Sequence, residues 1–329
     1  MNNVQIMAFG ACRPEDSLVY VSNDEISKIV ETTDDWVFSR TGMKGRYISK
    51  GANTSELCAK AGQDVLERAG ITADLLDIII VATVTSDYAM PSTSCIVQSM
   101  LGAKNAFAFD VSAACSGFVY GIAAAEKFLR AKDYRYALVL GGETMSKMLD
   151  WADRGTCVLF GDGAAGVLLC RGEKESFLAE DIHSDGDRYH TLTAGHIPVQ
   201  NPFSEVKGQT IYSMMQMDGR AVFDFAVKTI PGSIMAVLKK ANVSMDEVQY
   251  IVPHQANYRI VEALARKLKV ETSKFYTNMQ HYANTSAASI PLALAEMEQK
   301  GLISIGSGQK ILLTGFGGGL TWGSVLVQI

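Results

Sequence analysis

One cysteine stands among small residues in the segment DVSAACSGFVYGIA, which spans residues 110–123. A nucleophilic thiol needs this clearance, because a substrate carbonyl must reach both the sulfur and nearby backbone N–H groups. Cys115 also precedes a helical pattern, and the positive end of a helix dipole favours the thiolate. A buried and unreactive cysteine fits the same residues equally well.

Two polar side chains stand where an acyl group could be bound. His254 follows an apolar run in YIVPHQAN, which predicts the carboxyl end of a buried strand, where α/β proteins bind ligands. Asn284 in HYANTSAASIP directly precedes a helical pattern. A solvent-facing histidine and a helix N-cap are the plainer interpretations, although an N-cap asparagine can still donate a hydrogen bond to a ligand.

The segment TGFGGGLTWG at residues 314–323 is rich in glycine. Such a backbone is free to turn an N–H group toward a developing oxyanion. A plain turn between two strands is the alternative. The segment lacks GxGxxG spacing, which disfavours a nucleotide loop, and the chain has no HExxH motif, so we expect no metal.

The composition restricts the class of protein. The chain has 329 residues, 48% of them hydrophobic, and a net charge of −5, which argues against a general nucleic-acid binder. Its six cysteines form no CxxC pair and suit a reducing compartment. It shows no signal-peptide pattern and no run of about 18 apolar residues, so we expect a cytoplasmic protein without a membrane span.

The chain contains an internal repeat. Three pairs of segments match at offsets of 172, 174 and 174 residues: DLLDIIIVAT with DEVQYIVPHQ, SAACSG with SAASIP, and ALVLGG with ILLTGF. Continuous Val/Ile/Leu runs indicate strands buried on both faces, and their alternation with helical patterns indicates α/β layers. We therefore predict two duplicated halves, residues 1–175 and 176–329, with an irregular functional excursion at about 183–216.

Duplication would bring His254 and the helix start at Asn284 opposite the helix start at Cys115. The four motifs, in this order, resemble β-ketoacyl-[acyl-carrier-protein] synthase III, and the resemblance runs from the first strand to the last residue. It implies a thiolase-like α/β fold whose two duplicated halves pack as α-β-α-β-α layers. Elongating ketosynthases carry a second histidine where Asn284 stands, and thiolases carry a second cysteine where Phe316 precedes the glycines.

The resemblance also implies a reaction. The enzyme would join a short acyl-CoA primer, acetyl-CoA or similar, to malonyl-[acyl-carrier-protein] by decarboxylative Claisen condensation, and so initiate fatty-acid synthesis. Cys115 would carry the acyl group, with its oxyanion held by the N–H groups of Cys115 and Gly318. His254 and Asn284 would hold the malonyl thioester carbonyl during loss of CO₂. Coenzyme A is then part of a substrate, and no cofactor is expected.

The resemblance places the contacts to coenzyme A in the segments TTDDWVFSRTG and DRGT and at three further positions. Trp36 and Arg154 would sandwich the adenine, with Arg40 near the phosphates, whereas sequence alone would place Trp36 in the core. The pantetheine tunnel would be lined by Gly219, Phe223 and Asn257.

The acidic carrier protein would meet a basic face formed by Arg259, Arg266, Lys267 and Lys269, for which an ordinary solvated helix face is the alternative. Asp224 stands where the family often has a lysine, so the docking detail departs from the pattern.

Two further departures concern the pocket and its partner. The resemblance implies a homodimer paired through the strand AFAFDV. Met90 stands where many relatives have a phenylalanine that enters the partner's acyl pocket, and an adaptable methionine predicts a choice broader than acetyl. HYAN replaces the usual HGN before Asn284, and we expect the loop at Tyr282 to absorb the extra residue.

Other functions remain open from the sequence. The acceptor could be free malonyl-CoA, or the enzyme could prime polyketide synthesis. A thioester hydrolase or acyltransferase would instead use His254 as a base. A non-catalytic subunit of the same fold is disfavoured, because Cys115, His254 and Asn284 are all present.

Overall fold

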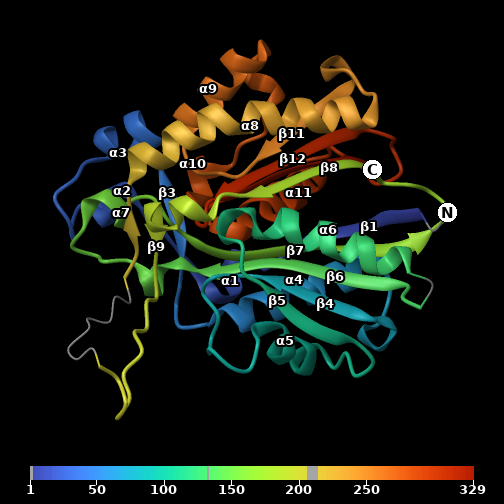
Figure 1. The fold of residues 1–329 in the computed structure, drawn as a ribbon, viewed down its shortest axis with the longest axis horizontal. Coiled ribbons are helices and arrows are strands. Elements are labelled where there is room, and N and C mark those ends of the chain that lie inside the picture. Colours follow the sequence, from blue (N-terminus) through green and yellow to red (C-terminus); the bar gives the residue numbers. More distant parts are fainter. Residues whose placement is uncertain (1–2, 132, 206–213) are drawn as a thin grey trace.

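The computed structural model describes residues 3–131, 133–205 and 214–329. Two mixed β-sheets lie one above the other, with helices between them and on both outer faces (Figure 1). The first sheet has the order β1-β7-β6-β4-β5, in which β4 runs parallel to β5 and β6. Its strands are β1 (Asn3–Ala11), β4 (Ile78–Ala82), β5 (Phe107–Val111), β6 (Tyr136–Thr144) and β7 (Asp162–Gly172).

The second sheet has the order β11-β12-β13-β8, with β11 and β12 parallel. Its strands are β8 (Phe177–Ser184), β11 (Val248–Pro253), β12 (Lys310–Gly317) and β13 (Thr321–Gln328). Two ribbons complete the described strands: β2 (Leu18–Ser22) with β3 (Gly45–Ser49), and β9 (Leu192–Thr193) with β10 (Gln216–Met217). Every residue of β4 is buried, as the continuous apolar sequence IIIVA predicts.

Helices α6 (Gly117–Arg130) and α11 (Ser289–Gln299) lie between the sheets. Helices α4 (Thr54–Ala69) and α5 (Thr93–Leu101) cover the first sheet, and α8 (Gly219–Ala241) and α9 (Tyr258–Leu268) cover the second (Figure 1). The short helices are α1 (Pro14–Ser17), α2 (Asn23–Ile26), α3 (Asp34–Thr41), α7 (Arg154–Cys157) and α10 (Met279–Tyr282). Single 3-10 turns are η1 (Ala73–Leu75), η2 (Ala114–Ser116), η3 (Met145–Met148), η4 (Gly186–Thr191), η5 (Met245–Glu247), η6 (Thr272–Lys274) and η7 (Ser286–Ala288).

Local sequence sets where the outer helices begin and end. Helix α4 begins at a capping box, in which the backbone N–H of Asn53 donates to the Glu56 carboxylate at 2.8 Å. It ends at Gly70, which adopts a left-handed φ of 66°. Helix α8 begins after Asp218, whose side chain accepts the N–H of Ala221 at 2.9 Å.

Helix α8 is the one helix among the described residues that is long and apolar enough to cross a membrane. Its apolar residues Phe225, Ile230 and Ile234 are instead buried in a core shared with the second sheet. Burial in that core accounts for the apolar stretch, as in the core helix of a soluble protein.

The two halves have matching backbone at their central helix starts. Ala114 before Cys115 has φ 46°, and Ser286, 172 residues later, has φ 49°. The sequence match of SAACSG with SAASIP is therefore two residues out of register, because Cys115 corresponds to Ala287 rather than Ser289. The two turns η2 and η7 lie in contact at the centre of the molecule.

The predicted excursion at 183–216 begins within β8, and the described chain that follows β9 leaves the body as an arm (Figure 1). It contains η4, β9 and β10, and residues 206–213 of it lie outside the described residues. Ile197, Val199 and Phe203 on this arm are exposed hydrophobic side chains.

Candidate active site

Cys115 lies in the turn η2, between the end of β5 and the start of α6. It is only 6% exposed, and Ala114 reaches its positive φ without a bulky side chain to clash. Burial raises the pKa of the Cys115 thiol to about 12. The expectation that the helix start would favour the thiolate is therefore not met in the resting site, because desolvation outweighs it.

His254 follows β11 and is 3% exposed. Burial lowers its pKa to about 3, so the ring is neutral at physiological pH. Nδ1 lies 2.8 Å from Oγ of Ser289, and the ring packs edge-on against Phe316, with 5.4 Å between ring centroids. The ring orientation is thus fixed from two sides.

Asn284 follows α10 and is 7% exposed. Its Oδ1 accepts the N–H of Ser286 at 2.9 Å, which leaves the NH₂ group for a ligand. The extra residue in HYAN is absorbed as expected: Ala283 takes a φ of 53°, and the Tyr282 ring packs against Tyr47 with centroids 5.2 Å apart. Asn284 therefore keeps its place beside the other two polar residues.

One cavity of about 130 Å³ brings the three predicted catalytic side chains together. Gly219, Phe223 and Asn257 also line it, as expected for the tunnel; its walls are Cys115, Leu159, Phe160, Leu192, Met217, Gly219, Val222, Phe223, His254, Ala256, Asn257, Ile260, Asn284, Phe316 and Gly317. Asn257 is also the N-cap of α9, with Oδ1 accepting the N–H of Arg259 at 2.9 Å.

The glycine-rich segment packs directly on the nucleophile. A Cβ placed on Gly317 would lie 2.5 Å from the amide nitrogen of Cys115, so only glycine allows this approach. Gly317 lines the cavity, whereas the predicted oxyanion donor Gly318 follows it, where a Cβ would lie 3.1 Å from the carbonyl oxygen of Leu192.

A second cavity of about 370 Å³ shares Leu159, Phe223 and Asn257 with the first and reaches the surface at Trp36 and Arg40. The guanidinium carbons of Arg40 and Arg154 each lie 4.5 Å from the centroid of the Trp36 ring system. The three residues predicted to bind adenine therefore lie together, with the Trp36 ring covered by the two arginines.

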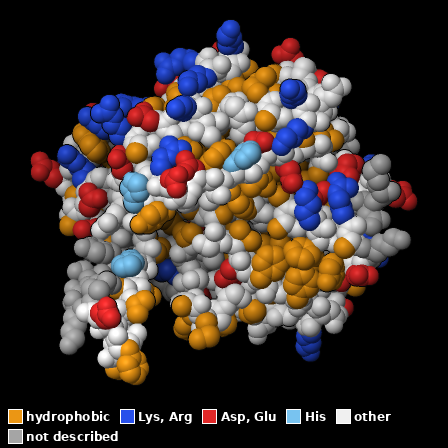
Figure 2. Space-filling model, in the orientation of Figure 1, with side chains coloured by type: hydrophobic (Ala, Val, Ile, Leu, Met, Phe, Trp, Pro, Cys, Tyr) orange, Lys and Arg blue, Asp and Glu red, His pale blue; other side chains and the backbone are white. Residues whose placement is uncertain are grey.

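The basic residues proposed for docking lie near this mouth. Arg266, Lys267 and Lys269 are exposed at the end of α9, and Arg259 donates to the carbonyl of Ser39 at 3.0 Å. Figure 2 shows Lys and Arg side chains gathered over the part of the molecule that contains α3 and α9. Asp224 is exposed on α8.

Met90 does not line this cavity. Its side chain is 86% exposed, on the loop before α5. The structure thus places it outside the pocket of its own chain.

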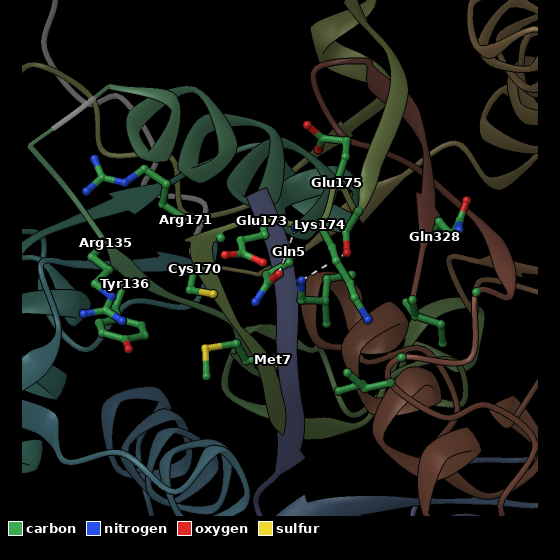
Figure 3. A pocket seen from close by; sticks show the side chains of 17 residues that line it. Gln5, Met7, Arg135, Tyr136, Cys170, Arg171, Glu173, Lys174, Glu175 and Gln328 are labelled. Atoms are coloured by element: carbon green, nitrogen blue, oxygen red, sulfur yellow. Dashed lines mark hydrogen bonds between the residues drawn. The ribbon is translucent and has the colours of Figure 1, made fainter. Parts of the chain in front are cut away.

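The largest cavity, about 690 Å³, lies elsewhere, between β1, the link from β7 to β8, and the C-terminal residues (Figure 3). Arg135 stacks over Tyr136 there, and the side chain of Gln5 accepts the backbone N–H of Lys174 at 3.4 Å. It contains none of the predicted site residues. Among the residues that the structure describes, no cluster of His, Cys, Asp and Glu could hold a metal ion.

Sequence reasoning missed three polar residues around the site. Ser289 fixes His254, and Ser286 lies in η7, which packs against the turn η2 that carries Cys115, where its hydroxyl acts to lower the pKa of the thiol. Glu143 on β6 is fully buried and accepts a hydrogen bond from Oγ of Ser286 at 2.9 Å. The signal was a charged residue inside the apolar strand ALVLGGET, where an unpaired carboxylate would be costly.

Comparison with known proteins identifies the family of the chain. Two family models match: 3-oxoacyl-[acyl-carrier-protein] synthase III over residues 109–186, and the C-terminal part of the same enzyme over residues 238–329. The chain is 50% identical to β-ketoacyl-[acyl-carrier-protein] synthase III of Streptococcus uberis, over 94% of this chain and 95% of that protein.

Solved structures give the same result. The 3-oxoacyl-[acyl-carrier-protein] synthase III of Aquifex aeolicus is 40% identical with a TM-score of 0.91, over 99% of this chain and all of that one. A priming β-ketosynthase from the R1128 polyketide pathway is 29% identical with a TM-score of 0.91, over 100% and 96%. These matches confirm the predicted thiolase-like fold. The chain therefore belongs to the β-ketoacyl-[acyl-carrier-protein] synthase III family, the acyltransferases that initiate fatty-acid synthesis by condensation.

Proposed function

We propose that this condensing enzyme transfers a short acyl group from coenzyme A to Cys115 and then joins it to malonyl-[acyl-carrier-protein], releasing CO₂ and giving the 3-oxoacyl-[acyl-carrier-protein]. One observation carries the proposal. Cys115, His254 and Asn284 line one cavity, and a second cavity, which opens at Trp36, shares the walls Leu159, Phe223 and Asn257 with it.

The first half-reaction is acylation of Cys115. The N–H groups of Cys115 and Gly318 are proposed to hold the oxyanion, with Gly317 packed close enough to bring this loop against the nucleophile. The oxygen carries a full negative charge only in the tetrahedral intermediate, so these donors stabilise that intermediate more than the ground-state thioester.

The second half-reaction needs two neutral donors for the enolate. Asn284 offers its NH₂ group. His254 offers Nε2–H in the tautomer whose Nδ1 accepts from the Ser289 hydroxyl. In the structure the Ser289 hydroxyl donates to the carbonyl of Ser286 at 2.8 Å. The backbone N–H of Ser289 bonds the same carbonyl, so the hydroxyl can turn to donate to Nδ1 without leaving that carbonyl unpaired.

Trp36, Arg40 and Arg154 are proposed to bind the nucleotide end of coenzyme A. An adenine between two flat groups requires them to lie about 7 Å apart, twice a van der Waals spacing. Arg154 lies 4.5 Å from Trp36, so it must swing outward as the adenine enters. Arg154 is held there by one bond to the carbonyl of Glu31, at 3.0 Å.

The carrier protein is proposed to dock on the basic face of α9, beside the same mouth. Arg266, Lys267 and Lys269 are free of salt bridges within the described residues, so they can meet acidic side chains of a partner.

A homodimer through the edge strand β5 is also proposed. An aromatic cluster of Phe107, Phe109, Phe128 and Tyr134 surrounds this edge. Figure 2 shows a hydrophobic patch over the region of β5 and β6. A second copy paired there would cover the patch, and the exposed Met90 would be available to the partner's acyl pocket.

The division into halves 1–175 and 176–329 follows the sheets, since all strands of each sheet come from one half. We place the enzyme in the cytoplasm, where the free thiols of all six cysteines would persist.

The test is mass spectrometry of the intact protein after incubation with a panel of acyl-CoAs. We expect one acyl group per chain on Cys115 and none in Cys115→Ala, whose enolate donors should still support slow malonyl decarboxylation. Condensation is then measured with malonyl-[acyl-carrier-protein] and with malonyl-CoA. A preference for malonyl-CoA would favour the alternative acceptor, and release of free acid without malonate would favour a hydrolase.

A further inference from the structure

Glu143 is a buried carboxylate at the carboxyl end of β6, and its surface is 0% exposed. One oxygen, Oε2, accepts hydrogen bonds from the loop after β4: from the hydroxyls of Thr83 and Thr85 at 3.0 and 2.5 Å, and from the amides of Val84 and Thr85, each at 3.1 Å. These donors hold the carboxylate in one orientation.

The other oxygen, Oε1, faces the active site. It accepts a hydrogen bond from Oγ of Ser286 at 2.9 Å, and Ser286 lies in η7, which packs against the turn η2 that carries Cys115. The Ser286 hydroxyl acts to lower the pKa of the Cys115 thiol, against the larger effect of burial. The Ser286 hydroxyl, from the second half, thus stands between two groups of the first half, the Cys115 thiol and the Glu143 carboxylate. A hydroxyl has one proton to donate and two lone pairs, so Ser286 can pass a proton between its two partners.

No cation pairs with this carboxylate among the described residues. Lys147 lies nearby, but its ammonium donates to the carbonyls of Thr85 and Ser86 at 2.6 and 3.0 Å. The titratable groups that interact with Glu143 are Cys58 of α4, Cys115 of η2 and Lys147 of η3.

Burial raises the pKa of Glu143, which favours its neutral form. A buried acid that no cation holds ionised can take up a proton more readily than one in a salt bridge.

We propose that Glu143 is a positioning residue for Cys115 that receives the thiol proton through Ser286 when the acyl group is transferred. This rests on the proposed role of Cys115 as the acylated residue. Ser286 gives its hydroxyl proton to Oε1 of Glu143 and takes the proton of the Cys115 thiol. The thiolate forms the new C–S bond to the acyl carbon, and the bond from that carbon to the sulfur of coenzyme A breaks.

The departing coenzyme A thiolate takes a proton from water at the open mouth. Glu143 keeps the thiol proton while the acyl group is bound. Condensation expels Cys115 as a thiolate, which recovers that proton through Ser286. The cycle then begins again from the same protonation state.

The competing account is a static brace, in which Glu143 only ties the loop at Thr83–Thr85 to η7. The two accounts differ in the pH dependence of Cys115 reactivity. If Cys115 and Glu143 share one proton, the pair has two forms: thiolate with neutral acid, and thiol with carboxylate. Both forms bind the same number of protons, so the fraction of Cys115 present as thiolate does not change with pH between the two ionisations of the pair. An isolated thiol instead becomes tenfold more reactive with each pH unit below its pKa.

The experiment measures alkylation of Cys115 by iodoacetamide from pH 5 to 10, following the peptide that contains Cys115 by mass spectrometry. The variants are Glu143→Gln and Ser286→Ala. Ser286→Ala suits its backbone, because Ala114 has the same positive φ at the matching position of the first half. Asp162→Asn is the control, since Asp162 is an equally buried carboxylate, held by Ser49 and Ser146.

We expect a plateau in the alkylation rate of the wild type around neutral pH and in Asp162→Asn, and a tenfold rise per pH unit in the two relay variants. Their acylation rate at pH 7 should fall about 10²-fold, as for loss of a general base. If Glu143→Gln does not fold, Ser286→Ala decides alone. A profile of the same shape in all four proteins, or loss of the plateau in Asp162→Asn, would overturn the proposal. Alkylation reports on the thiol itself, so this outcome is distinct from a failure of acyl transfer.

Discussion

Asn284 divides two tasks between the two atoms of its amide. Oδ1 accepts the N–H of Ser286 at 2.9 Å, and both residues are buried. The NH₂ group remains for the malonyl carbonyl. Replacement by Ala removes both atoms, whereas replacement by Ser keeps an oxygen that caps the backbone N–H but is too short to reach the substrate.

The two substitutions should therefore separate catalysis from stability. Asn284→Ala leaves the buried N–H of Ser286 without a partner, which costs about 1–3 kcal/mol of unfolding free energy. Asn284→Ser should lose well under half of that. Both variants lose one enolate donor, so malonyl decarboxylation and condensation should fall about 10²–10³-fold in each. Acylation of Cys115 should survive in both, because its oxyanion uses other donors.

Three measurements decide this: CO₂ release from the malonyl thioester, acyl transfer followed by intact mass, and urea unfolding. Decarboxylation at the wild-type rate in Asn284→Ser would refute the donor role. Equal loss of acylation and decarboxylation in both variants, in proportion to lost stability, would show that Asn284 only holds the fold.

Three further outcomes are expected. Because burial lowers the pKa of His254 to about 3, the unfolded chain binds a proton near pH 6.5 that the folded chain does not, so stability should fall as pH drops from about 6.5 toward 3. In calorimetric melting, His254→Gln should lessen that fall, and an unchanged pH dependence would contradict the buried neutral ring. Met90→Phe should narrow the choice of primer toward acetyl, and Met90→Ala should widen it. If the ratio of kcat/KM for acetyl-CoA to kcat/KM for a branched acyl-CoA is the same in both variants as in the wild type, Met90 does not affect primer choice. Light scattering should show a homodimer that Phe107→Asp dissociates, and a wild-type monomer at micromolar concentration would exclude the β5 interface.

The sequence predicts the polar site residues that lie at the ends of strands or the starts of helices. Cys115, His254 and Asn284 each follow or precede a recognisable apolar pattern, and the repeat brings those patterns to one place. Trp36 and Arg154 meet across 118 positions of chain, and only the family resemblance suggested that contact. No local pattern encodes it, because the two residues lie on separate short helices, Trp36 partly buried on α3 and Arg154 exposed on α7.

Two features depend on burial, which a linear pattern does not give. The raised pKa of Cys115 follows from desolvation at the centre of two packed halves. Glu143 was overlooked because its partners, Thr85 and Ser286, come from distant segments. The two-residue error in the register of the repeat has another cause. The sequence match aligned similar small residues, whereas the backbones of the two halves match where Ala114 and Ser286 both have a positive φ.

The matched helix starts have a consequence for stoichiometry. The fold supplies two equivalent cradles, one at Cys115 and one at Ala287, each facing a glycine of a central strand. At the second cradle a Cβ on Gly141 would lie 2.3 Å from the carbonyl oxygen of Ala287, so strand and turn pack there as closely as Gly317 packs on Cys115, but Ala287 has no nucleophilic side chain. Duplication has thus given a chain with two matching turns but a nucleophile in only one of them, and the second turn, η7, contributes Ser286 to the surroundings of the first.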